Sequence, residues 1–170
     1  MSKRRISSFW PLLVIGFAVV ASAGIFWSDA QTGSAHASTD DAEIVVYKTP
    51  SCGCCHNWIA HLRKHGLTVV AKNVATTQPI RSELGVPPAL TSCHTGVVDN
   101  YWIEGHVPAD LVQRLLKERP EDISGIAVPG MPAGSPGMEG PNPVTYDVVA
   151  YHKDGTVSIY ATRDGHATPQ

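Results

Sequence analysis

The segment from residue 43 to residue 74 most strongly constrains the fold, because its hydrophobic pattern changes period twice. β-Branched and aromatic residues dominate 43–48, as in a buried strand. Apolar residues then recur at helical spacing from Cys52 onwards, and Gly66 provides a stop signal after His65. A second β-branched run covers residues 67–74. A strand, a helix and a strand of these lengths form a βαβ unit, so the sequence predicts that the two strands are parallel.

The next elements follow in an order that indicates a fold class. They are a short helix, two strands joined by the hairpin signal Asp99-Asn100 and a further helix, at residues 79–84, 89–98, 101–103 and from 108 to Pro120. The resulting order, β-α-β-α-β-β-α, is that of a thioredoxin-like α/β fold. Such a fold has a proline just before its third strand, so we expect a cis peptide bond at Pro87 or Pro88.

The C-terminal part of the chain departs from this pattern. Residues 125–143, here called the Gly/Pro loop, contain five Gly, five Pro and two Met. A segment of this composition is not expected to form regular structure, and its length favours a functional role. Two β-rich runs, 144–151 and 156–161, then flank a Lys-Asp-Gly turn. They predict a C-terminal β-hairpin that folds back on the same domain.

The N-terminus has the pattern of an export signal. A basic start precedes an uncharged apolar run, residues 10–27, and small residues that end at Ala37. We therefore expect residues 1–37 to be a signal peptide and 38–170 to be a single thioredoxin-like domain with its core at 43–162. An uncleaved membrane anchor is the alternative, because the run approaches the length of a spanning helix. In both cases the domain is expected in the periplasm, with membrane contact only if the signal is uncleaved.

Composition limits the classes of partner. Apolar residues make up 43% of the 170 residues and charged residues 16%, which is enough for a core and excludes a wholly disordered chain. The formal charge of −2 provides no basic surface, so we expect no nucleic-acid partner. Four cysteines are too few for a disulfide-dense mini-protein.

Three of these cysteines, Cys52, Cys54 and Cys55, lie where the first strand ends and the first helix begins. Amide groups at a helix start stabilise thiolates. Cys93 follows the proline pair and is expected near the other three. Three interpretations are open: a structural disulfide between Cys52 and Cys55, a thiol–disulfide oxidoreductase that uses the same pair, and a metal centre. The metal centre is favoured because it alone uses all four sulfurs.

The spacing of the cysteines favours copper as the metal. Adjacent side chains at a helix start point about 100° apart, so Cys54 and Cys55 bind neighbouring ions more easily than a single ion. Zinc prefers two separate ligand pairs, and an iron–sulfur cluster would need assembly outside the cytoplasm. Cu(I) accepts two or three soft ligands and tolerates bridging sulfurs. We expect copper, as Cu(I) or Cu(II), with more than one ion per chain.

Three further residues are candidate ligands. Met131 and Met138 lie in the Gly/Pro loop, where a thioether has no apolar face to join. His94 follows Cys93 directly, and successive strand residues face opposite ways. We therefore expect His94 beside the site or at the surface rather than on the metal. His61 and His65 are expected on a solvated helix face.

The motifs around these residues resemble those of the CopG-type copper-resistance proteins, an exported family long described as a domain of unknown function. The motifs comprise residues 47–55 with Trp58, then 86–88, 92–95, 104–108, 128–132 and 134–139. The resemblance extends over residues 43–162. It implies a thioredoxin-like periplasmic protein that binds copper through clustered cysteines and acts in copper resistance.

Carried over residue by residue, the family's cysteine cluster corresponds to Cys52, Cys54, Cys55 and Cys93, and its loop methionines to Met131 and Met138. Sequestration, redox interconversion and delivery as a metallochaperone remain open. We expect a metal-binding or redox-active protein rather than a turnover enzyme. The expected partners are copper ions and periplasmic copper-handling or electron-transfer proteins.

Overall fold

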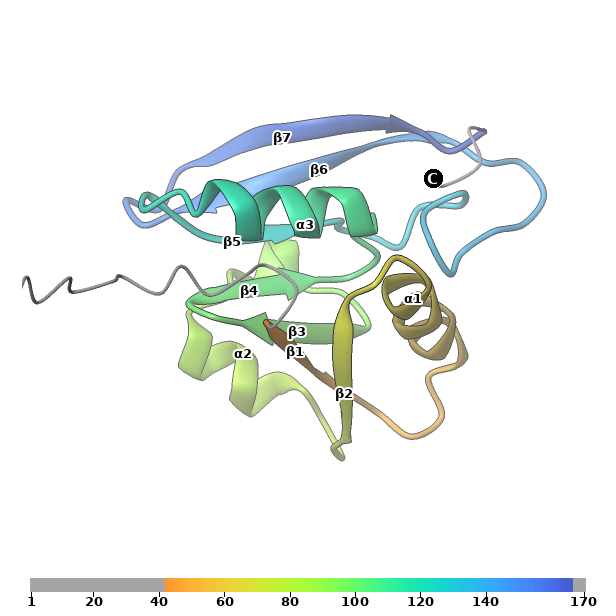
Figure 1. The fold of residues 1–170 in the computed structure, drawn as a ribbon, viewed down its shortest axis with the longest axis horizontal. Helices are drawn as coiled ribbons and strands as arrows, with labels where there is room; N and C mark the ends of the chain where they lie inside the picture. Colours follow the sequence, from red (N-terminus) through yellow and green to blue (C-terminus); the bar gives the residue numbers. More distant parts are fainter. Residues whose placement is uncertain (1–41, 167–170) are drawn as a thin grey trace, which may run out of the picture. The chain divides into compact units, whose positions relative to one another are not determined.

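The computed structural model describes residues 42–166, so the expected signal peptide at residues 1–37 lies outside the described residues. The described chain forms a mixed α/β structure with one seven-stranded sheet and three α-helices (Figure 1). Within this range no helix combines the length and the apolar character that crossing a membrane requires.

The order of the elements extends the predicted one. They are β1 (Glu43–Lys48), α1 (Gly53–Lys64), β2 (Thr68–Asn73), α2 (Gln78–Leu84), the 3₁₀ turn η2 (Pro88–Leu90), β3 (His94–Val98), β4 (Tyr101–Glu104), α3 (Ala109–Glu118), β5 (Ile123–Ala127), β6 (Thr145–His152) and β7 (Val157–Asp164). The strands lie in the order β2-β1-β3-β4-β5-β6-β7. β1 and β2 are parallel, which confirms the predicted βαβ unit.

Strand β5 is the main departure from the sequence prediction. It runs parallel to β4 and antiparallel to β6, although residues 125–127 belong to the segment predicted to be irregular. Gly125 lies opposite Trp102, and a Cβ at Gly125 would overlap the indole ring. The glycine that indicated a loop is therefore the residue that lets this strand pack. β6 and β7 then extend the sheet as the predicted hairpin.

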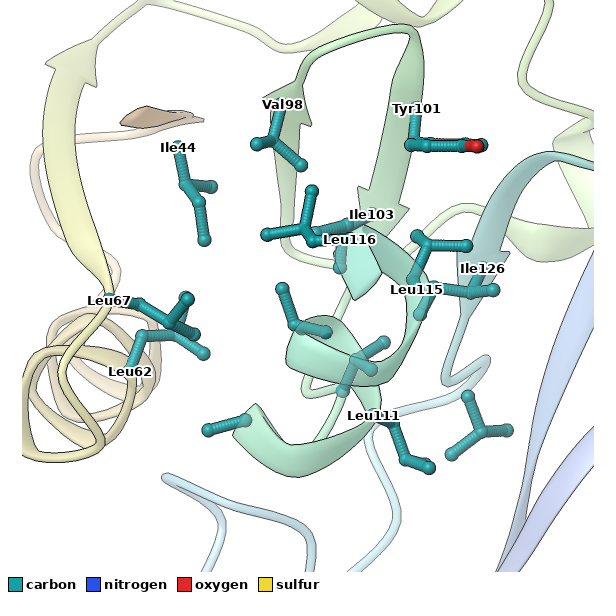
Figure 2. Close-up of a cluster of buried hydrophobic side chains, with 14 of the residues drawn as sticks. Ile44, Leu62, Leu67, Val98, Tyr101, Ile103, Leu111, Leu115, Leu116 and Ile126 are labelled. Carbon is teal, nitrogen blue, oxygen red and sulfur yellow. The ribbon is translucent and has the colours of Figure 1, made fainter. Parts of the chain in front are cut away.

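Helices α1 and α3 cover one face of the sheet. Leu62 and Leu115 from the helices pack with Ile44 and Ile126 from the strands, and all four side chains are fully buried (Figure 2). Burial of one such side chain contributes about 1.5–3 kcal/mol. A second cluster, which includes Trp102, joins η2 to the other face, because neighbouring strand residues alternate between faces. This packing holds the start of α1 at the carboxyl end of β1.

The segment between α2 and β3 differs from the expected proline loop. All peptide bonds of residues 42–166 are trans, so the expected cis bond at Pro87 or Pro88 is wrong. Pro87 is extended, with φ −63° and ψ 138°, and Pro88 begins η2. Both conformations suit the restricted φ of proline. Gly85 ends α2 in the left-handed region at φ +68°, as its place after Leu84 predicted.

Candidate metal centre

The first three cysteines lie around the first turn of α1. Cys52 is the residue before the helix, and its side chain forms no capping hydrogen bond within the described residues. Cys55 is fully buried on the core face, whereas Cys52 and Cys54 are partly buried. The amide groups of the first turn have no helical acceptor and carry the positive end of the helix dipole. This end of α1 therefore favours anionic sulfur.

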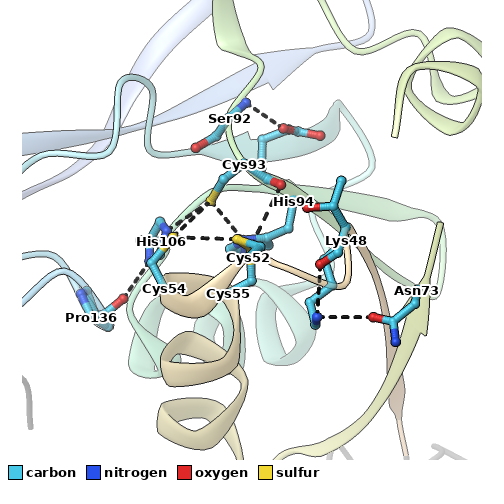
Figure 3. The surroundings of a disulfide bond; sticks show 12 residues. Lys48, Cys52, Cys54, Cys55, Asn73, Ser92, Cys93, His94, His106 and Pro136 are labelled. Atoms are coloured by element: carbon cyan, nitrogen blue, oxygen red, sulfur yellow. Dashed lines mark hydrogen bonds between the residues drawn. A yellow bond between two sulfur atoms is a disulfide. The ribbon is translucent and has the colours of Figure 1, made fainter. Parts of the chain in front are cut away.

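Cys93 lies just before β3 and meets this group. The Sγ atom of Cys54 is 3.6 Å from that of Cys52 and 3.9 Å from that of Cys93. The Sγ atoms of Cys52, Cys54, Cys55 and Cys93, here called the four-cysteine cluster, all lie within 4.8 Å of one another (Figure 3). The structure thus brings the four predicted residues together, and their role as metal ligands stays a prediction.

Two of the four sulfurs are bonded to each other. Cys52 and Cys55 form a disulfide with their Cα atoms 5.4 Å apart, and Cys54 and Cys93 are free thiols. Only the reduced form of the pair can offer four sulfurs to a metal. The cluster therefore has a state with two available sulfurs and a state with four.

The environment of Cys93 keeps its sulfur protonated. Burial, and next the nearby sulfur of Cys54, raises the pKa of Cys93 to about 12. A thiol of this kind is a weak nucleophile at neutral pH, because the thiolate is the reactive form. Metal binding would displace the proton, since a cysteine binds metals as the thiolate. The environment of Cys93 thus suits a ligand better than an attacking group.

Two buried histidines adjoin Cys93. The Nδ1 atom of His94 and the Nε2 atom of His106 lie 3.2 Å and 3.1 Å from Cys93 Sγ. His106 Nδ1 lies 2.7 Å from the carbonyl oxygen of Pro136, which can only accept a hydrogen bond. This nitrogen therefore carries the proton, and Nε2 presents its lone pair towards Cys93. Cys93, His94 and His106 form a second group of potential ligands within 4.8 Å of one another.

Both imidazoles are neutral at pH 7. Burial, and next the adjoining His106, lowers the pKa of His94 to about 3. Burial also lowers the pKa of His106. His94 was expected either beside the site or at the surface, and the structure places it beside the site. Successive side chains of a strand point to opposite faces, but this rule does not apply to Cys93 and His94, because β3 begins only at His94.

His106 was missing from the candidates drawn from the sequence. It lies beside Cys93 because β3 and β4 pair as a hairpin in which Thr95 faces Glu104. Continued two residues beyond this pair, away from the turn, the antiparallel register places His106 opposite Cys93. The predicted hairpin turn at Asp99-Asn100, extended to a register, could have found this residue.

His61 is not on a solvated face, contrary to the prediction. It is half-buried, and its Nε2 accepts a hydrogen bond of 3.1 Å from the backbone N–H of Ala109, the first residue of α3. His65 is also half-buried, and its Nδ1 lies 2.8 Å from the carbonyl oxygen of His61. Burial, and next the neighbouring His65, lowers the pKa of His61 to about 4. His61 therefore links α1 to α3 rather than facing water.

The Gly/Pro loop packs against the start of α1. A Cβ at Gly137 would lie 2.7 Å from the backbone nitrogen of Trp58 and 2.9 Å from the carbonyl oxygen of Cys54. Gly137 also has φ +84°, which favours glycine. Met138 follows it and is half-buried, whereas Met131 is 40% exposed. A role for either methionine as a ligand stays a prediction.

A buried cation lies in the same surroundings. Lys48, opposite His94 in the register of β1 and β3, is 1% exposed. Its Nζ donates to the carbonyl oxygen of Thr49 and to Oδ1 of Asn73, both at 3.1 Å (Figure 3). Among residues 42–166, no carboxylate forms an ion pair with it. A buried positive charge with neutral partners favours anionic groups nearby.

Comparisons with known proteins connect this chain to copper-resistance proteins. A family model described as "Protein of unknown function, DUF411" matches residues 90–138, which include Cys93, His106 and both loop methionines. No curated protein matches. Two solved structures, described as copper resistance protein CopG forms 2 and 1, are each 43% identical and cover 72% of this chain. The matches span 98% and 97% of those chains, with TM-scores of 0.68 and 0.67. The chain therefore belongs to the family of CopG copper-resistance proteins.

Proposed function

We propose that this protein binds copper as Cu(I) at the four-cysteine cluster, in a thiolate-bridged centre of more than one ion. It would act in copper resistance in the periplasm, by sequestration or by interconversion of Cu(I) and Cu(II). The observation that carries the proposal is the convergence of four sulfurs within 4.8 Å. Two would suffice for thiol–disulfide exchange.

The donor set fits copper. Soft sulfur ligands select Cu(I), zinc or iron–sulfur clusters, and imidazole also binds copper. Cys52, Cys54, Cys55 and Cys93 would hold the metal, and His106 has its Nε2 lone pair aimed at the same place. Bound copper would supply a one-electron redox centre. Met131, Met138 and His94 are further candidate ligands.

The disulfide supports a redox role. Oxidation of the Cys52–Cys55 dithiol to the disulfide releases two electrons and two protons. Two Cu(II) ions that arrive as substrate would take up the two electrons and become Cu(I). Cys54 and Cys93 keep their thiols in this state and would remain to hold the product. Redox interconversion and four-sulfur binding would therefore belong to two states of the same site, with the disulfide formed or reduced.

The proposed periplasmic location and the proposed thioredoxin-like fold are supported by different observations. The pattern of residues 1–37 supports export, and a disulfide agrees with an oxidising compartment. The order of elements from β1 to α3 supports a thioredoxin-like domain, to which β5, β6 and β7 add a C-terminal extension.

Anaerobic titration of the reduced protein with Cu(I) tests the proposal. We expect more than one copper ion per chain, by elemental analysis, with thiolate–copper absorption in the ultraviolet. A free-thiol count on the same sample should fall as copper is added. Uptake of one ion or none would contradict the multinuclear centre.

A thiol–disulfide oxidoreductase is the second candidate function. The observation in its favour is the Cys52–Cys55 disulfide at the start of α1, where the helix dipole would stabilise a leaving thiolate. This candidate predicts that metal-free protein reduces a disulfide substrate with many turnovers and that activity depends on Cys52. Absence of such turnover in the metal-free protein would exclude it.

A further inference from the structure

A buried ion pair adjoins the segment that carries Cys93. Arg81 reaches from α2 to Glu104 at the end of β4, and their side chains are 11% and 0% exposed. The guanidinium Nε and Nη2 lie 3.1 Å from Oε1 and 3.1 Å from Oε2 of the carboxylate. This two-point contact fixes the orientation of both groups.

The pair holds the backbone on one side of Cys93. The N–H of Ser92 donates to Glu104 Oε2 at 2.9 Å, and the carbonyl oxygen of Ser92 accepts from Arg81 Nη2. On the other side of Cys93, the hydroxyl of Thr95 bonds to Glu104 Oε1. Both polar backbone groups of Ser92 are thus bound by this one ion pair.

Cys93 itself lies outside the helices and strands. The strand β3 begins at His94, and the turn η2 ends at Leu90. Cys93 therefore lies in a connecting segment, and its sulfur must still meet sulfurs from another element. A buried ion pair is a weak source of stability, because desolvation offsets its attraction. Its contacts with Ser92 point to a geometric role.

We propose that Arg81 and Glu104 are positioning residues that hold Cys93 within reach of Cys54 before any metal binds. The inference rests on the proposed function for its consequence, since a fixed fourth sulfur lowers the ordering cost of copper binding. The positioning itself is a property of the metal-free protein. It can therefore be measured without copper.

The test uses the Cys52→Ser/Cys55→Ser variant, in which Cys54 and Cys93 are the only cysteines. This protein is equilibrated with reduced and oxidised glutathione. The two thiols lose two electrons and two protons to one glutathione disulfide, which forms a Cys54–Cys93 bond and two glutathione thiols. The equilibrium constant gives the effective concentration of one thiol at the other. Failure of copper binding in the wild type would leave this measurement unaffected.

The decisive variant adds Arg81→Met and Glu104→Met to that background. It removes both charges together, so no unpaired charge stays buried, and such replacements often preserve stability. We expect the effective concentration to fall at least tenfold while the melting temperature is kept. In the four-cysteine protein, the same pair of changes should reduce the copper count to that of Cys93→Ser.

The control is Arg114→Met with Glu118→Met, which removes an ion pair whose side chains are 46% and 50% exposed. It should leave the effective concentration unchanged. If the decisive variant fails to fold, Arg81→Lys replaces it, because lysine keeps the charge for Glu104 and loses the second donor to Ser92. That variant should lower the effective concentration at least threefold. A folded variant of either kind with the unchanged value overturns the proposal.

Discussion

The Sγ atoms of Cys54 and Cys93 lie 3.9 Å apart, although the residues are 39 positions apart in the sequence. The start of α1 supplies the first sulfur and the residue before β3 supplies the second. Antiparallel pairing of β1 with β3 brings these two places together, with Lys48 opposite His94. Thiol–disulfide exchange needs only the two cysteines in the first helix turn and no sulfur from another element. The contact between Cys54 and Cys93 is therefore expected for a metal centre and is not required for exchange.

Cys54→Ser should abolish the multinuclear centre and leave exchange chemistry intact. The change removes the sulfur that contacts both Cys52 and Cys93. We expect copper to fall to one ion or none per chain in protein purified from copper-fed cells, as measured by elemental analysis. Any disulfide turnover by Cys52 and Cys55 should be kept. A full copper count in the variant would remove Cys54 from the proposed ligands.

His106→Gln should weaken Cu(I) binding by about 10–100-fold, as expected for loss of an imidazole at a metal site. Its Nε2 lies 3.1 Å from Cys93 Sγ. Competition with a Cu(I) chelator of known affinity measures the effect. His56→Gln, at an exposed position in α1, is the matched control and should bind as the wild type. Equal losses of Cu(I) affinity in the two variants would contradict a role for His106 in metal binding.

Gly137→Ala should lower the stability of the protein by about 1–3 kcal/mol, because the new side chain meets α1 and the backbone has a positive φ. Displacement of the loop should also disturb the hydrogen bond between Pro136 and His106. Urea unfolding measures the first effect and Cu(I) competition the second. Gly140→Ala is the control, since a Cβ there meets nothing within 4 Å. Equal stability of the two variants would contradict the close packing.

Lys48→Met should weaken copper binding without lowering the stability of the metal-free protein. Removal of a buried ammonium with neutral partners should leave the metal-free protein as stable as before or more stable. Loss of the positive charge should weaken binding of an anionic copper–thiolate centre by about tenfold. Thermal unfolding and Cu(I) competition check the two effects. Unchanged copper affinity would show that Lys48 does not balance the charge of the site.

The metal-free protein should lose stability in acid through His61. Its pKa of about 4 in the folded state lies below 6.5, so the unfolded chain binds more protons between these values. The contribution of His61 is complete above pH 6.5 and is lost as the pH falls towards 4. Partial exposure limits the loss to about 1–2 kcal/mol. The charged or titratable groups that act on His61 are His65, Glu139, Asp110 and Lys64.

Urea unfolding at pH 7.5 and at pH 4.5 measures this loss in the wild type and in His61→Gln. The difference between the two pH values should be smaller in the variant, because glutamine does not titrate. The same difference in both proteins would contradict the assignment of the acid sensitivity to His61.

Local signals were sufficient for much of the fold. Gly66 and Gly85 marked helix ends, and Asp99-Asn100 marked the β3–β4 hairpin, because each requires only its neighbours in the chain. β5 was missed for the opposite reason. Gly125 is destabilising in an isolated strand, and its value appears only when the indole ring of Trp102 occupies the space above it.

The candidate site divides in the same way. The sequence by itself determined which donor atoms are available, three sulfurs at a strand-to-helix boundary and a fourth further on, and such a set favours soft metals. Tertiary structure decided which side chains stand around those sulfurs. His106, Lys48 and the Arg81–Glu104 pair reach the site through strand pairing and helix packing between distant segments. The reason is that ligand type follows from covalent chemistry, whereas proximity follows from the free energy of packing the whole domain.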